Sequence, residues 1–352
     1  MRIPTISLLR ICIVPDVSQQ TRRTETHSWR ITGAAGFIGS ALTARLNAEG
    51  FRDLVLVDDF KARPDKVRNH ANRVCAQRVD RADFPAWLEA NENQVQFVFH
   101  LGARTDTTEQ DHGLLDQLNF QYSQDIWRLC VRFGLPLVYA SSAATYGSGE
   151  HGYSDDHGIV NRLKPLNPYG ESKQKFDLWA LSETQANRAP YFWTGLKFFN
   201  VYGPGEYHKG RMASVVMHAF RQIEKTGGMN LFRSHRADYA DGEQLRDFVY
   251  VRDVVDVCHW LMHHRKDSGL YNLGSGKARS FLDLTRATFK ALDAPENIGF
   301  IDTPEDIRDT YQYFTEADLS KLRSIGYDRN MTPLEKGVSE YVREFLVPNL
   351  TL

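Results

Sequence analysis

Short apolar runs alternate with helix-length segments between residues 28 and 200 of this 352-residue chain. One such segment carries apolar residues at three- and four-residue steps, among them Leu118, Tyr122 and Ile126, and stops at Gly134. This alternation predicts βαβ units, and therefore a doubly wound parallel α/β sheet with helices on both faces. The runs expected to form strands are WRIT (29–32), LVLV (54–57), VQFVF (95–99), LPLVYA (135–140) and TGLKFF (194–199).

A glycine-rich turn follows the first of these runs and opens a helix. It reads TGAAGFIGS, with glycines at positions 33, 36 and 39, and a tight turn of this kind lets the backbone approach a pyrophosphate at the helix N-terminus. Asp58 lies 19 residues after Gly39, at the end of the second run, where an acid can bind an adenosine ribose. The pattern is typical of Rossmann-type sheets that bind a nicotinamide dinucleotide, with Gly33, Gly36, Gly39 and Asp58 at the cofactor.

Four cations follow Asp58 within ten residues, namely Lys61, Arg63, Lys66 and Arg68. Asp58 alone favours NAD, whereas such a cluster favours the 2′-phosphate of NADP. An ordinary solvated charged loop is the alternative. We therefore expect NADP, with Lys66 among the cofactor-binding residues and NAD as the alternative.

The division into domains follows from this cofactor pattern and from a change in loop length. We expect residues 28–200 to form the dinucleotide-binding domain, to which residues 247–274 return. Beyond residue 200 the loops are longer and rich in charged and aromatic residues, so residues 201–352 should form mainly a smaller α/β substrate lobe. Residues 1–27 hold four arginines and no lysine, and we expect a disordered extension, with a transit peptide as the alternative.

Charge and cysteine usage exclude several classes of partner. Lys plus Arg is 43 and Asp plus Glu is 44, which gives no general attraction for nucleic acid or an anionic membrane. The chain holds no apolar run long enough to span a membrane. Its four cysteines lie far apart without metal-ligand spacing, so we expect reduced thiols, no metal and a cytoplasmic location.

The segment PYGESK places Tyr169 and Lys173 four residues apart, on one face of a predicted helix. An ammonium and an oxidised nicotinamide should both lower the pKa of the phenol, so that Tyr169 acts as a general base. Ser142 follows another predicted strand, where sites gather in open parallel sheets, and its hydroxyl can donate to the reacting oxygen. A helix-surface pair and a turn serine are the alternatives, but the order of these motifs is more specific than any of them alone.

In this order TGAAGFIGS, HLGARTDTTE, YASSAATYG and YGESK resemble the extended short-chain dehydrogenases/reductases, the NAD-dependent epimerase/dehydratase family, from residue 29 into the C-terminal region. FFNVYGPGEYHKGRMASVVMH and YQYFTEADLSKLRSIGYD are closer still to the branch that inverts C-6 of ADP-heptoses. The resemblance implies a Rossmann-type fold, tightly bound NADP and a role in nucleotide-sugar supply for the lipopolysaccharide core. It also implies a homo-oligomer, such as a pentamer.

The resemblance assigns roles residue by residue. Tyr169 and Lys173 are the catalytic pair with Ser142, and Lys209 is a second acid/base, because the two epimers present their hydroxyls in different directions. Lys209 can serve if burial and the neighbouring cations His208 and Arg211 depress its pKa; phosphate binding is its alternative role. Further implied cofactor residues are Phe37, Ile38, Asp59, Leu101, Gly102, Ala103, Arg104, Thr105, Asn119, Lys173, Val201 and His208. The implied substrate residues are Asn200, Lys209, Arg211, His218, Leu231, Phe232, Arg233, Ser234, Arg246 and Tyr311.

Three rival functions stay open at this point. A sugar-nucleotide 4,6-dehydratase would need an acidic pair after Ser142, where the chain reads Ala143-Ala144. A UDP-hexose 4-epimerase would need only the tyrosine and would leave YHKGRMASV unexplained. A dinucleotide-responsive sensor would need neither Tyr169 nor Lys173. The family pattern also has a serine where this chain has Arg211, so the chain departs from the family at this substrate contact.

Overall fold

Seven parallel strands form the central sheet of the computed structural model, which describes residues 28–308 and 311–352. The strand order is β10-β6-β5-β4-β1-β2-β3, and every neighbouring pair is parallel. The doubly wound sheet predicted from the apolar runs is therefore confirmed, while the predictions for residues 1–27 lie outside the described residues. The strands are β1 (Ser28–Thr32), β2 (Leu54–Asp58), β3 (Gln77–Asp80), β4 (Val95–His100), β5 (Leu137–Ser142), β6 (Trp193–Phe198) and β10 (Gly269–Leu273).

The two edge strands, β3 and β10, are not among the predicted runs. An edge strand has a neighbour on one side only, so it needs a less continuous apolar sequence than a central strand. In β3 the first two residues, Gln77 and Arg78, are exposed, and only Val79 is buried. The sequence GLYNL of β10 is fully buried but contains a glycine and an asparagine, which weaken a strand pattern.

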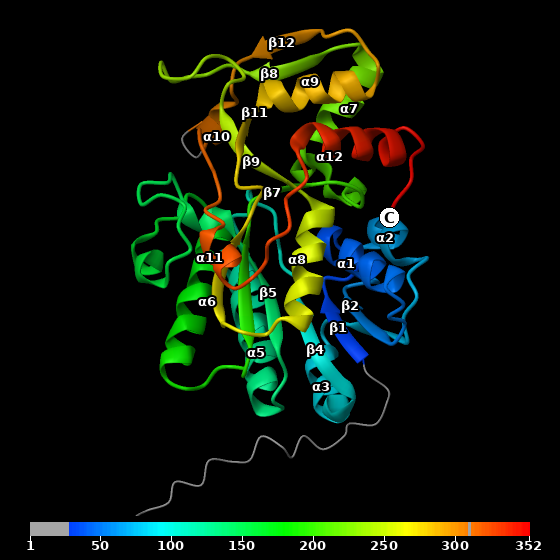
Figure 1. Ribbon diagram of the computed structural model, residues 1–352, viewed down its shortest axis with the longest axis vertical. Helices are drawn as coiled ribbons and strands as arrows, with labels where there is room; N and C mark the ends of the chain where they lie inside the picture. Colours follow the sequence, from blue (N-terminus) through cyan, green and yellow to red (C-terminus); the bar gives the residue numbers. More distant parts are fainter. Residues whose placement is uncertain (1–27, 309–310) are drawn as a thin grey trace, which may run out of the picture.

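Both faces of the sheet are buried because successive side chains of a strand point to opposite faces. In β2, Leu54 and Leu56 pack into one core, whereas Val55 and Val57 pack into another. The first face is covered by α1 (Phe37–Ala48) and α8 (Val251–His263), which lie against each other in Figure 1. The second is covered by α3 (Phe84–Asn91), α5 (Tyr122–Arg132) and α6 (Pro168–Gln185). Truncation of the fully buried Leu56 to alanine should cost about 2–5 kcal/mol.

The strand order reverses at β1 and β4, so the loops that follow these two strands meet at the carboxyl edge of the sheet. Gly33 adopts φ +71°, and a Cβ placed on it would lie 2.6 Å from Gly102 Cα. Only glycine fits this contact. In open α/β sheets this reversal point is where dinucleotides bind.

The chain beyond β6 builds most of a second, smaller lobe. One three-stranded sheet has the order β11-β9-β7, and strands β8 and β12 form a parallel pair. Residues 245–250 form β9 of this lobe, and the chain then returns to the large sheet as α8 and β10. In Figure 1 the small lobe lies above the large sheet, and the C-terminus comes back beside α2. The predicted division into two domains stays a prediction.

The remaining elements are short or belong to the small lobe. The strands are β7 (Asn200–Tyr202), β8 (Met229–Phe232), β9 (Leu245–Tyr250), β11 (Ala278–Ser280) and β12 (Ile298–Ile301). The helices are α2 (Val67–His70), α4 (His112–Leu115), α7 (Val215–Thr226), α9 (Phe281–Ala291), α10 (Glu305–Arg308), α11 (Ser320–Ser324) and α12 (Leu334–Glu340). Within residues 28–308 and 311–352, no helix is long and apolar enough to cross a membrane.

The described cysteines and acidic or histidine side chains form no covalent or metal centre. Cys75, Cys130 and Cys258 are free thiols, while Cys12 lies outside the described residues. In the same part of the chain, no group of three or more His, Cys, Asp or Glu residues is arranged to hold a metal ion.

Candidate active site

Helix α6 carries Tyr169 and Lys173 at its N-terminal end. Its start is fixed by Asn167, whose Oδ1 accepts a hydrogen bond of 2.8 Å from Gly170 N, and by Pro168 in the first turn. Both side chains are buried, with Tyr169 9% and Lys173 5% exposed. Lys173 Nζ donates to the carbonyl oxygen of Ala140 in β5 at 2.9 Å, so one turn of α6 is held against the catalytic end of that strand.

Ser142 ends strand β5, and its hydroxyl lies near enough to the phenol of Tyr169 to lower the pKa of that phenol. Its Oγ accepts from Ala144 N at 3.1 Å, which leaves the hydroxyl hydrogen for an acceptor in the site. Its carbonyl oxygen accepts from Thr145 Oγ1 at 2.8 Å. The structure thus brings the predicted serine, tyrosine and lysine together at the carboxyl end of β5, where the tyrosine and lysine are buried and the serine is half-buried.

Burial, and not the charge of Lys173, dominates the pKa of Tyr169 in this structure, while the predicted lowering by an ammonium together with an oxidised nicotinamide stays a prediction. Burial raises the pKa of the phenol, and the hydrogen bond from Ser142 opposes that rise only in part. Burial also lowers the pKa of Lys173 to about 8, and the carboxylate of Asp177 opposes this change. The dominant cause for both groups is loss of water, because each charged form loses its hydration inside the fold.

The glycine loop is braced by Asp58. The Oδ2 of Asp58 accepts from Ala35 N at 2.9 Å, and Oδ1 accepts from its neighbour Asp59 N at 2.8 Å and from Lys66 Nζ at 2.9 Å. Helix α1 begins at Phe37 with no acid in its first turn and no side-chain cap at Gly36. Its first N–H groups therefore face the loop without a side-chain partner, which suits a phosphate.

Of the four cations after Asp58, Lys66 is the one that contacts the carboxylate of Asp58. Arg63 is paired with Asp65 at 2.6 Å, and Arg68 donates to the carbonyl oxygen of Asn349 at 2.6 Å. Arg68 also stacks over the ring of Tyr207. The prediction that these four cations form one phosphate-binding cluster therefore includes too many residues, because Arg68 binds the C-terminal segment instead.

Asn119 braces the loop that follows β4 instead of presenting a free amide. Its Oδ1 accepts from Arg104 N at 2.8 Å, and its Nδ2 donates to Arg104 O at 3.0 Å and to Ser172 Oγ at 2.9 Å. These bonds use both amide hydrogens, so Asn119 shapes the predicted cofactor loop 101–105 and ties it to α6. The side chain of Arg104 is itself paired with Glu109 at 2.8 Å.

Lys209 lies in a short 3₁₀ segment, Tyr207–Met212, that contains a sharp bend at Gly210. Its Nζ is 5.1 Å from the centre of the Phe37 ring, which places the ammonium beside the glycine loop. Burial lowers the pKa of Lys209, whereas the fully buried Glu206 opposes that change. This is the direction that an acid/base role requires.

The neighbouring cations are not the cause of that shift. Burial lowers the pKa of His208 to about 4, so His208 is neutral near neutral pH and adds no positive charge. Arg211 is exposed, and the shift of Lys209 does not arise from it. Burial alone lowers the pKa of Lys209, and the prediction that His208 and Arg211 lower it is wrong.

Asn69 is a site residue that the sequence did not single out. Its buried Nδ2 lies 3.1 Å from Ala35 O, 2.8 Å from Gly205 O and 3.2 Å from His208 Nδ1. One amide therefore joins the glycine loop to the segment that carries Lys209. Nothing in the polar stretch KARPDKVRNH signals this role, because the partner at Gly205 is 136 residues away along the chain.

Three of the predicted substrate residues gather in the small lobe. The guanidinium of Arg246, only 6% exposed, lies over the ring of Tyr311 at 5.3 Å and donates to the Gln312 carbonyl oxygen. Phe232 meets the same tyrosine ring edge-on, with centroids 6.4 Å apart. These contacts make an aromatic and cationic surface that suits a nucleotide base and phosphate.

The other predicted substrate residues are more scattered. The side chain of Leu231 is buried in the small-lobe core, and the predicted contact of this residue with the substrate stays a prediction. His218 Nε2 lies 3.2 Å from Arg211 O, and Ser234 N donates to Asp241 Oδ1 at 2.8 Å. Asn200 is exposed at the start of β7, and Val201, a predicted cofactor residue, is half-buried beside it.

Comparison with known proteins shows the family of this chain. The model of the NAD dependent epimerase/dehydratase family matches residues 29–274. The chain belongs to this family. Within it, the ADP-L-glycero-D-manno-heptose-6-epimerase of Fusobacterium nucleatum subsp. nucleatum is 46% identical over 326 residues, which cover 90% of this chain and 97% of that protein. The enzyme of the same name from Nitratidesulfovibrio vulgaris (strain DP4) is 47% identical over 318 residues, covering 90% and 97%.

A solved structure of the family has the same fold. The crystal structure of the Helicobacter pylori ADP-L-glycero-D-manno-heptose-6-epimerase superposes with a TM-score of 0.75 at 26% identity, covering 90% of this chain and 95% of that one. Within the NAD dependent epimerase/dehydratase family, a nicotinamide dinucleotide is the cofactor class, and the uncapped start of α1 beside Gly33 fits its pyrophosphate.

Proposed function

We propose that the protein is an ADP-glyceromanno-heptose 6-epimerase, an isomerase that interconverts ADP-D-glycero-β-D-manno-heptose and ADP-L-glycero-β-D-manno-heptose. Two acid/base candidates at the carboxyl edge of the sheet carry this proposal: Tyr169 beside Ser142 at the end of β5, and Lys209 beside Phe37 at the glycine loop after β1. A second acid/base group is what inversion needs, because the two epimers present the same hydroxyl in different directions. The relatives that share both the length and about half of the sequence carry that activity in their names.

Bound in the glycine loop, NADP would supply an acceptor that takes a hydride from C-6 and gives it back. The preference for NADP over NAD rests on Lys66, whose ammonium lies 2.9 Å from Asp58 Oδ1. The carboxylate of Asp58 is thus neutralised and already braces Ala35 N. A ribose 2′-phosphate would meet a cation at this position, whereas the free acid that favours a 2′-hydroxyl is paired.

Tyr169 would take the proton from the C-6 hydroxyl of one epimer. Burial favours its neutral phenol in this structure, so the positive charges nearby have to stabilise the phenolate during the reaction. The oxygen of the Ser142 hydroxyl accepts from Ala144 N, so the hydroxyl hydrogen can be donated to the sugar oxygen as the ketone forms. Lys173 is fixed by Ala140 O and keeps a positive charge beside the phenol below its pKa of about 8.

Lys209 would serve the other epimer. Burial lowers the pKa of its ammonium, so it gives up a proton more readily than an exposed lysine and can return it. Arg246, Tyr311 and Phe232 would hold the nucleotide in the small lobe while the sugar turns. The ketone could then present either face at C-6 to the same acceptor.

One assay tests the proposal directly. The purified protein, without added nicotinamide, should convert ADP-D-glycero-β-D-manno-heptose into a mixture of both C-6 epimers, and denaturation should release NADP. Inversion of UDP-glucose with no turnover of the ADP-heptose would contradict the proposal and favour a hexose 4-epimerase. A homo-oligomer such as a pentamer, a role in lipopolysaccharide supply and a cytoplasmic location stay predictions.

A further inference from the structure

Helix α6 presents a third polar side chain in line with Tyr169 and Lys173. Asp177 follows Lys173 by four residues, as Lys173 follows Tyr169, so all three lie on one stripe of the helix. The stripe lies against successive residues of β5. Asp177 Oδ1 accepts from Tyr139 OH at 3.0 Å, and its Oδ2 accepts from Ser141 Oγ at 2.7 Å. The proposed reaction uses the first two members of the stripe and assigns nothing to the third.

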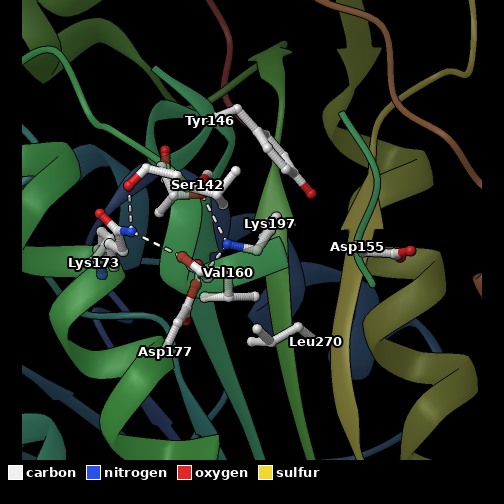
Figure 2. Close-up of polar contacts among 12 residues, drawn as sticks. Ser142, Tyr146, Asp155, Val160, Lys173, Asp177, Lys197 and Leu270 are labelled. Carbon is white, nitrogen blue, oxygen red and sulfur yellow. Dashed lines mark hydrogen bonds and ion pairs between the residues drawn. The ribbon is translucent and has the colours of Figure 1, made fainter. Parts of the chain in front are cut away.

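Asp177 forms a completely buried ion pair with Lys197 of β6. The distance from Lys197 Nζ to Asp177 Oδ2 is 2.7 Å, and both side chains are 0% exposed (Figure 2). Burial of two charges costs hydration that their attraction often fails to repay, and apolar residues of similar volume are frequently as stable. Stability is therefore a weak explanation for this pair, and a role in setting geometry is a better one.

The Asp177–Lys197 ion pair is hydrogen-bonded to residues on both sides of Ser142. Lys197 Nζ donates to Thr145 Oγ1 at 2.8 Å, and Thr145 Oγ1 donates in turn to Ser142 O at 2.8 Å. On the other side, the hydroxyl of Ser141 is bound by Asp177. Figure 2 shows Lys197 and Asp177 beneath Ser142, with Lys173 beside them. The two charges thus fix the position of Ser142, whose hydroxyl lies near the phenol of Tyr169.

We propose that the Asp177–Lys197 ion pair is the positioning device of the acid/base site, which sets the register of α6 on β5 and holds Ser142 against Tyr169. The inference deepens the proposed function and rests on it. Apolar packing alone tolerates small sliding of a helix on a sheet, whereas directional bonds from one carboxylate to three donors do not. A misplacement of about 1 Å in such a site costs on the order of 10²-fold in rate.

The test replaces the pair by apolar residues of similar size, in Asp177→Leu/Lys197→Met. We expect kcat for the ADP-heptose to fall about 10- to 100-fold while KM changes less than about twofold. The melting temperature should fall, because the buried Tyr139 and Ser141 hydroxyls lose their acceptor, whereas the amount of bound dinucleotide should stay close to that of the parent protein. The matched control is Glu183→Met/Arg188→Leu, which removes a 2.7 Å ion pair at the exposed end of the same helix and should leave kcat unchanged.

A milder pair of variants keeps the test decisive if the double variant does not fold. Thr145→Val removes the bridging hydroxyl between Lys197 and Ser142 and should lower kcat about tenfold at constant KM. Thr145→Ser keeps that hydroxyl and should restore kcat to within about twofold of the parent value. A folded Thr145→Val protein with parental kcat would overturn the inference.

Crystal structures of the same variants separate this inference from the proposed function. We expect the Tyr169 phenol and the Ser142 hydroxyl to lie farther apart in the double variant and in Thr145→Val than in the parent protein. If the parent protein does not invert the ADP-heptose, the proposed function fails and this distance alone decides the inference. Unchanged distances with unchanged kinetics would refute it.

Discussion

The two acid/base groups of the site rest on very different supports. Tyr169 lies on an 18-residue helix whose buried stripe is bonded to β5 and to a fully buried ion pair. Lys209 lies on a six-residue 3₁₀ segment with a bend at Gly210, which connects β7 to α7. Tyr169 is thus part of the rigid core, whereas Lys209 is part of a connecting segment.

This difference explains how one site can act on two epimers whose C-6 hydroxyls point in different directions. A group on the sheet can be held in one orientation, because its neighbours on β5 are fixed by the core. A group on a connecting segment can follow the sugar when the small lobe binds the nucleotide. We therefore expect substitutions on the Tyr169 side to remove chemistry, and those on the Lys209 side to affect chemistry and loop geometry together.

The largest effect should come from Tyr169→Phe. The variant keeps the ring and its packing but loses the proton carrier, so kcat should fall about 10³-fold while the dinucleotide stays bound. Steady-state kinetics and the amount of cofactor released on denaturation measure this. The control is Tyr271→Phe, which removes a buried hydroxyl bonded to Asp267 O and should keep parental kinetics. A small effect of Tyr169→Phe would mean that the rigid side is not the catalytic one.

Lys209→Met should come next, with kcat lower by about 10²-fold. Because its Nζ lies beside Phe37, the amount of bound dinucleotide should also fall slightly, unlike in Tyr169→Phe. Lys225→Met, at the exposed end of α7, is the matched control and should behave as the parent protein. If Lys209→Met only raises KM, the lysine binds diphosphate and the two-sided account is wrong.

The pH profile should show a limb from Lys173, whose pKa burial lowers to about 8. Above this pH the ammonium is lost, and kcat/KM should fall about tenfold per pH unit. Because the pKa is lower in the folded than in the unfolded chain, the unfolded state binds more protons between pH 8 and the ordinary lysine pKa of 10.5. This group therefore makes the fold more stable, not less, as pH rises through that window.

Far-ultraviolet circular dichroism across the same pH range separates this titration from unfolding. The spectrum should stay constant while activity falls. His208, with its pKa lowered to about 4, should add no limb near neutral pH, so His208→Gln should leave the shape of the profile unchanged. A limb near neutral pH that disappears in this variant would contradict the assignment.

The smallest effect should come from Asn69→Leu, which cuts the link between the glycine loop and the Lys209 segment. Two buried carbonyl oxygens, Ala35 O and Gly205 O, lose their donor, so we expect a loss of about 1–3 kcal/mol in the free energy of unfolding. We also expect kcat to fall about tenfold. Urea unfolding and steady-state kinetics provide the two readouts.

The matched control for Asn69→Leu is Asn47→Leu. Asn47 Nδ2 donates to Phe51 O and to Val74 O, both at 2.9 Å, away from the site. This variant should lose stability without losing activity. Equal loss of activity in both variants would mean that Asn69 has no special link to Lys209.

The parts of the molecule that follow from local pattern could be predicted from the sequence. The five apolar runs became the five inner strands, and Tyr169, Lys173 and Ser142 meet because a helix face and a strand end place them together.

Asn69, Asp177 and Lys197 could not be found in this way. Their partners are distant in sequence, and polar residues in polar or mixed stretches carry no sign of burial. The pKa of His208 and of Tyr169 likewise depends on burial, which neighbouring charges in the sequence do not reveal.

The most direct test of the two-sided account is a single-turnover experiment with each pure epimer. Tyr169→Phe and Lys209→Met, each loaded with oxidised cofactor, are mixed with one epimer at a time, and the near-ultraviolet absorbance of reduced nicotinamide is followed. The account predicts that each variant fails to oxidise a different epimer and still oxidises the other. Failure of both variants with the same epimer, or full oxidation of both epimers by Lys209→Met, would contradict it.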